Sequence, residues 1–136
     1  MSNILLGAGG LIYLVLGTLH WVYTFYTPRF RPYDESVEAG MKATTPRLTK
    51  RTTMWKAWMG FNGSHSTGAM FFGFMALYFS LAAMPVFKTS ILLQVVVLIN
   101  SAYYMYLGKK YWFSIPRNGI ILATIFFTIA IVLFYI

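Results

Sequence analysis

Four long apolar stretches constrain this chain more than any other feature of its sequence. They cover about residues 4–26, 57–83, 89–108 and 119–136. Each approaches or exceeds the roughly 20 mostly apolar residues that a helix needs to cross a hydrocarbon core about 30 Å thick. Only 10% of the residues are charged, whereas a soluble domain carries about 25%. The sequence therefore predicts an all-α integral membrane protein, in which residues 1–136 form one transmembrane domain built as an antiparallel four-helix bundle.

The connections between these stretches differ in length. The segment 27–56 is the only long one. Segment 84–88 predicts a tight turn with a proline stop, and Pro116 predicts a break within segment 109–118.

The long connection carries its own helix signal. Asp34 is a good N-cap residue, and Glu38 and Lys42 are spaced to pair one helical turn apart. We expect a short helix here, resting on the membrane surface.

The distribution of basic residues predicts the orientation in the membrane. Of the eleven basic residues, only Lys88 falls on the side that also holds both chain ends. The other ten lie in the first and third connections: Arg29, Arg31, Lys42, Arg47, Lys50, Arg51, Lys56, Lys109, Lys110 and Arg117. Cytoplasmic loops carry such an excess. We therefore expect a bacterial-type inner membrane, with loop 27–56 in the cytoplasm and both termini outside.

The same distribution accounts for most of the net charge of +8, so no nucleic-acid partner is predicted. Membrane lipids are the expected partners. Because so short a chain buries little surface between its own helices, self-association or docking into a larger membrane complex is also expected. The chain contains no cysteine, which excludes a thiolate nucleophile, Cys-ligated zinc and iron–sulfur clusters.

The first part of the second apolar stretch is too polar to face lipid. Trp58, Asn62 and His65 form one helical stripe, because they are spaced four and three residues apart. Gly60, Ser64 and Gly68 form a row of small residues beside it. Such a row predicts close approach of a neighbouring helix, and we expect the first span there.

Polar residues recur at a similar depth in the other spans. From the helix rise, His20 lies about 10 Å inside the loop end of its span, Asn62 about 8 Å and His65 about 12 Å. Asn100 lies about 12 Å from the end of the third span, and Thr124 about 8 Å into the fourth. Intramembrane polar residues usually face the bundle interior and are candidates for function. The candidate ligand-binding residues are His20, Trp58, Asn62, His65, Asn100 and Tyr104.

Several functions suit this layer. The leading hypothesis is a small membrane protein that binds an amphipathic ligand (a lipid, quinone or isoprenoid) in a cytoplasmic-leaflet cavity lined by His20, Asn62 and His65. The first alternative is a non-catalytic subunit of a membrane complex. The second is a small intramembrane enzyme or haem protein, with the two histidines as proton carriers or axial ligands. No metal site is predicted, because two histidines and an amide are a poor ligand set. The sequence identifies neither a cofactor nor catalytic residues.

Overall fold

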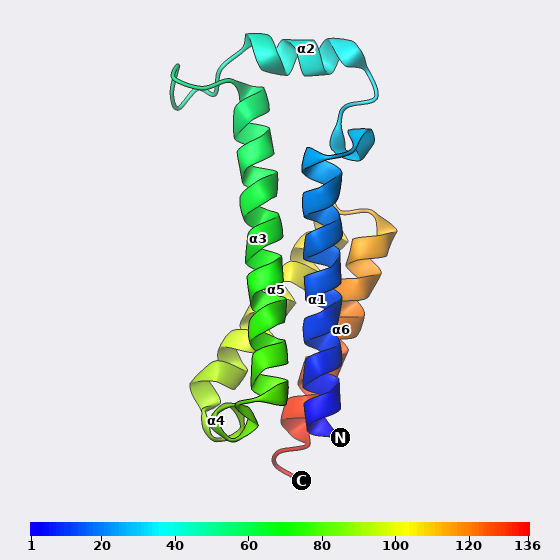
Figure 1. Cartoon of the computed structure of the whole chain (residues 1–136), viewed down its shortest axis with the longest axis vertical. Coiled ribbons are helices and arrows are strands. Elements are labelled where there is room, and N and C mark those ends of the chain that lie inside the picture. Colours follow the sequence, from blue (N-terminus) through cyan, green and yellow to red (C-terminus); the bar gives the residue numbers. More distant parts are fainter. The chain divides into compact units, whose positions relative to one another are not determined.

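The structure, a computed structural model, describes all residues from Met1 to Ile136 and contains helices but no strands (Figure 1). The elements are α1 (Ser2–Phe25), the 3₁₀ turn η1 (Pro28–Phe30), α2 (Glu35–Ala43), α3 (Met54–Leu81), α4 (Met84–Thr89), α5 (Ile91–Tyr111) and α6 (Ser114–Val132).

Three helices are long and apolar enough to cross a membrane: α1, α5 and α6. This finding makes the chain a membrane protein by length and composition. The longest helix, α3, has 28 residues but is not among the three. Its first half carries Lys56, Asn62 and His65, which lower its mean hydropathy. Three of the four predicted spans are therefore long and apolar enough to cross, and the four-helix bundle stays a prediction.

Two connections differ from the sequence prediction. Residues 84–88, predicted as a turn, lie in the short helix α4, with Pro85 in its first turn. Pro116 lies in the first turn of α6, and the break comes earlier, at Trp112 and Phe113. Both prolines are tolerated because amide groups in a first helical turn have no partner within the helix.

The short helix expected in the long connection is α2. The Asp34 side chain accepts a hydrogen bond from the Ser36 amide at 2.8 Å, and Lys42 pairs with Glu38 at 2.6 Å. Hydrogen bonds from the side chain and backbone of Ser36 hold the pKa of the Asp34 carboxyl below its usual range. The Asp34 carboxylate is therefore charged at neutral pH, and its negative charge interacts favourably with the positive N-terminal end of the helix dipole.

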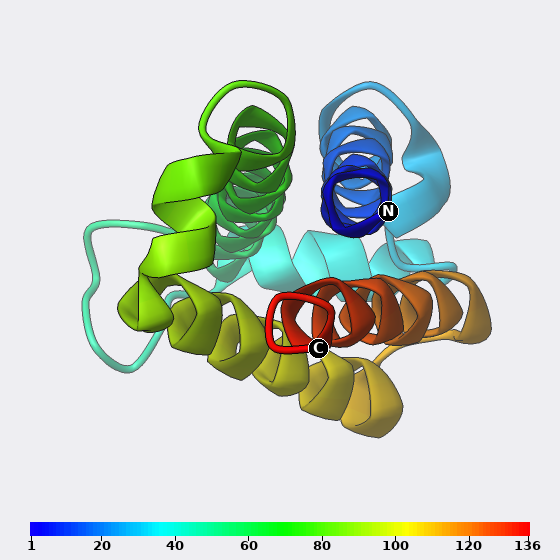
Figure 2. The same ribbon diagram turned by 90° about the horizontal axis from the view of Figure 1, so that it is seen from below.

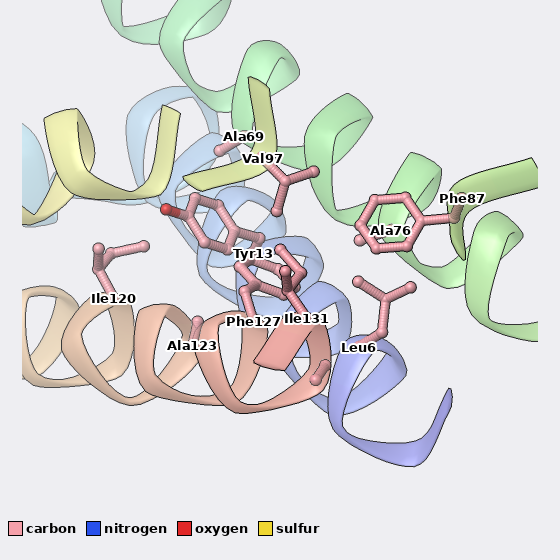
Figure 3. Close-up of a cluster of buried hydrophobic side chains, with 11 residues drawn as sticks. Leu6, Tyr13, Ala69, Ala76, Phe87, Val97, Ile120, Ala123, Phe127 and Ile131 are labelled. Carbon is pink, nitrogen blue, oxygen red and sulfur yellow. The ribbon is translucent and has the colours of Figure 1, made fainter. Parts of the chain in front are cut away.

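The chain divides into two compact units. The first contains Met1–Leu16 and Ala69–Ile136, and the second contains Gly17–Gly68. In the first unit, α5 and α6 pack along each other as an antiparallel pair (Figure 2). A buried apolar cluster fills this unit (Figure 3). Tyr13 is fully buried there, and its ring packs against Phe72, Tyr104 and Phe127.

Glycines let α1 and α3 touch within the first unit. A Cβ on Gly73 would lie 2.5 Å from the Gly10 carbonyl oxygen, and a Cβ on Gly10 would lie 2.8 Å from the Gly73 carbonyl oxygen. The expectation for the row Gly60, Ser64 and Gly68 is wrong, because all three residues are exposed. A Cβ on Gly60 would meet nothing within 4 Å. The approach of the first helix uses a different glycine of α3 and a different face.

Candidate functional site

The second unit brings His20 and Asn62 together. The Nε2 atom of His20, in α1, lies 2.9 Å from the Oδ1 atom of Asn62, in α3. The loop-side ends of the two helices run antiparallel and side by side here, with α2 between them along the chain (Figure 1). The two residues are 42 positions apart in sequence, so the bond joins two helices across the long connection.

The direction of this bond follows from the other end of the Asn62 amide. Its Nδ2 atom donates to the backbone carbonyl of Trp58 at 2.8 Å. A flipped amide would set two oxygens against each other, so Oδ1 faces His20. An amide oxygen only accepts, and His20 Nε2 therefore carries the proton. In the neutral ring Nδ1 is then left as the acceptor.

Two aromatic rings flank the His20 imidazole. The His65 ring, from α3, lies edge to face with its centroid 5.1 Å away. The Phe30 ring lies 4.4 Å away at a tilt of 37°. Phe30 reaches this position because η1 turns the chain back immediately after α1, and the Thr27 side chain caps that turn by accepting from the Arg29 amide. Sequence reasoning missed Phe30, since nothing in the pattern after α1 predicts the direction of the turn.

The hydroxyl groups that follow Asn62 in α3 donate hydrogen bonds to backbone carbonyls of the same helix. Ser66 donates to the Asn62 carbonyl at 2.7 Å, Ser64 to the Phe61 carbonyl and Thr67 to the Gly63 carbonyl. A nucleophilic hydroxyl needs a base within hydrogen-bond reach. These hydroxyl groups point to backbone oxygens instead.

The cluster is a poor fit for metal or haem ligation by both rings. No group of three or more His, Cys, Asp or Glu side chains lies close enough to hold a metal ion. Two axial imidazoles have to sit on opposite faces of a haem with the iron between them. Rings that meet edge to face at 5.1 Å leave no space for a macrocycle.

The remaining candidate residues, Asn100 and Tyr104, belong to the first unit. Tyr104 packs edge to face on Tyr13, with centroids 5.5 Å apart. The Asn100 amide nitrogen is buried in this unit, as are the hydroxyl groups of Tyr13 and Ser101. The structure therefore brings His20, Trp58, Asn62 and His65 together within one unit, whereas Asn100 and Tyr104 belong to the other. That all four spans share one polar layer stays a prediction.

Comparisons with protein families, with characterised proteins and with solved structures return no match for this chain. The function has to be inferred from the geometry of these side chains.

Proposed function

We propose that this protein binds a small amphipathic, lipid-like ligand (a lipid, quinone or isoprenoid) at the group formed by His20, Asn62 and His65. The observation that carries the proposal is the hydrogen bond between His20 Nε2 and Asn62 Oδ1, at 2.9 Å, with the His65 ring against it. Ionisable side chains are rare in apolar helices and are retained there mainly for function.

The hydrogen-bonding state of the group suits a ligand with a polar head. In neutral His20 the Nε2 proton is used by Asn62, and Nδ1 can accept a hydrogen bond from a hydroxyl or a protonated head group. Both histidine side chains are only partly buried, so a ligand can reach this region from the surrounding lipid. Apolar surfaces of the neighbouring helices would contact the hydrocarbon part of the ligand.

The proposal includes a location and a topology. We propose that α3 crosses the membrane as a fourth span, that loop 27–56 faces the cytoplasm of a bacterial-type inner membrane, and that both termini lie outside. Ten of the eleven basic residues support this orientation. A helix of 28 residues is about 42 Å long, which is more than the roughly 30 Å of a hydrocarbon core.

A second candidate function is a non-catalytic subunit of a membrane complex. The exposed row Gly60, Ser64 and Gly68 favours it, because small residues in membrane helices usually mark a helix contact. That contact is not made within the chain.

The test is ligand retention by the protein purified in mild detergent. We expect mass spectrometry of extracted small molecules to find a stoichiometric amphipathic compound with the wild-type protein. His65→Gln keeps the size and polarity of the side chain, and should fold but lose most of that compound. Thr67→Ala is the matched control, because Thr67 lies two residues further on and bonds only to the Gly63 carbonyl. Equal retention in all three proteins would remove His65 from the site. Co-purification of another protein in stoichiometric amount, without a small molecule, would favour the complex-subunit function.

A further inference from the structure

A cleft of about 340 Å³ opens in the second unit. This volume lies in the range of roughly 300–1,000 Å³ that is typical of small-molecule sites. Its walls come from η1, the segment that follows it, α2 and α3: Arg29, Phe30, Arg31, Pro32, Met41 and Trp58. Trp58 is the only one of them that the sequence had marked as a candidate.

The two arginines of the cleft have no carboxylate partner. The only ion pair of the chain joins Lys42 and Glu38. Arg29 is held in place by Tyr23, whose hydroxyl accepts from Nη1 at 3.0 Å and whose ring centroid lies 4.6 Å from Cζ. A guanidinium has five donors, so Arg29 keeps most of its own for another group. Arg31 is exposed, and its side chain makes no hydrogen bond or ion pair.

The apolar walls connect this cleft to the histidines. Phe30 lines the cleft and also packs on the His20 ring at 4.4 Å. Trp58 lines it too, and its carbonyl accepts from the Asn62 amide. An anionic group between the arginines would therefore sit beside aromatic and thioether surfaces that suit an attached hydrocarbon.

We propose that the cleft binds the phosphate group of the ligand, with Arg29 and Arg31 as its donors. The planar fork of arginine matches phosphate oxygens in two-point hydrogen bonds, and the absence of competing carboxylates leaves donors of both arginines available. This inference rests on the proposed function, since it specifies the head group of the ligand that the histidine group would hold. The phosphate can belong to an anionic lipid or to a soluble phosphate ester, and the experiment separates these sources.

The experiment is isothermal titration of the full chain in neutral detergent with three probes: short-chain phosphatidic acid, short-chain phosphatidylcholine and inorganic phosphate. We expect phosphatidic acid to bind, and the double variant Arg29→Gln, Arg31→Gln to weaken it by roughly tenfold or more. The matched control is Arg47→Gln, Arg51→Gln, which removes the same charge from exposed positions of the same connection. It should change the affinity by less than about twofold, as expected for screened surface charges.

Each outcome has a defined consequence. Equal weakening by both double variants would show a general effect of loop charge and overturn the proposal, as would failure of both phosphatidic acid and inorganic phosphate to bind. Comparable binding of inorganic phosphate, lost in the cleft variant, would support the site with a soluble ester as its ligand. Much tighter binding of phosphatidic acid would support it with a lipid. If the cleft variant retains the co-purified compound while His65→Gln loses it, this inference fails and the proposed function stands. If the cleft variant loses the compound while His65→Gln retains it, the cleft is supported as a phosphate site and the proposed histidine site fails.

Discussion

At the scale of single residues, the contact between His20 and His65 has a measurable consequence. The rings share an edge-to-face contact at 5.1 Å, and His20 also donates to Asn62. Removing one ring changes the surroundings of the other, so the double loss should cost less than the sum of the single losses. For His20→Leu and His65→Leu we expect a coupling free energy of about 0.5–2 kcal/mol.

The measurement is reversible unfolding in detergent of the wild type, both single variants and the double variant. A parallel cycle that pairs His20→Leu with Thr67→Ala should be additive, because Thr67 bonds only to its own helix. Additivity in both cycles would show that the two rings do not share an environment, and a joint site would then have no basis.

The sequence predicted part of this residue-level arrangement. Counting helix rise placed His20, Asn62 and His65 at nearly the same depth, and the structure joins the first two by a hydrogen bond. Two features were beyond such counting. The return of Phe30 onto His20 depends on the local geometry of η1, and the cleft depends on how that turn and α2 lie around Trp58. A periodic apolar pattern records which residues of a helix face its neighbours, but it does not record the direction of the turn that follows the helix.

At the scale of helices, glycine positions decide where α1 and α3 touch. Gly73→Ala would place a Cβ 2.5 Å from the Gly10 carbonyl oxygen and 2.6 Å from the Leu14 amide nitrogen. Backbone atoms cannot move aside as a flexible side chain can, so the helices must separate. We expect a loss of about 1–3 kcal/mol in stability, as for overpacked interiors, measured as a lower unfolding temperature in detergent.

Gly60→Ala provides the matched control in the same helix. The added Cβ meets nothing within 4 Å, and alanine favours a helix over glycine by up to about 1 kcal/mol. The variant should therefore be as stable as the wild type or more stable. A loss at Gly60 equal to that at Gly73 would contradict the assigned contact.

The helix scale also shows why one prediction succeeded and another did not. The Asp34 cap and the Glu38–Lys42 spacing are local signals, and α2 forms where they lie. The row Gly60, Ser64 and Gly68 is equally regular, yet it is exposed. Gly10 and Gly73 lie in more ordinary apolar sequence and make the contact instead. Small residues permit close approach on any face, and the choice among faces depends on the packing of the whole helix.

At the scale of the whole molecule, the proposed function depends on α3 crossing the membrane. Three helices meet the length and hydropathy criteria, and α3 does not. Its polar first half holds Asn62 and His65, which is what a span with an internal ligand site requires. If α3 crosses, the long loop and the connection at Lys88 lie on opposite sides.

Labelling of introduced cysteines tests this arrangement directly, because the chain has none of its own. Lys50→Cys places a thiol before the start of α3, and Lys88→Cys places a thiol after its end. With a membrane-impermeant maleimide on intact cells, we expect Lys88→Cys to react and Lys50→Cys to react only after the membrane is opened, since ten of the eleven basic residues fall in the first and third connections. Reaction of both in intact cells, or of neither, would mean that α3 does not cross. Reaction of Lys50→Cys alone would reverse the orientation. The histidine group and the arginine cleft both lie in the unit that contains the long loop, so this experiment also determines from which leaflet a ligand would enter.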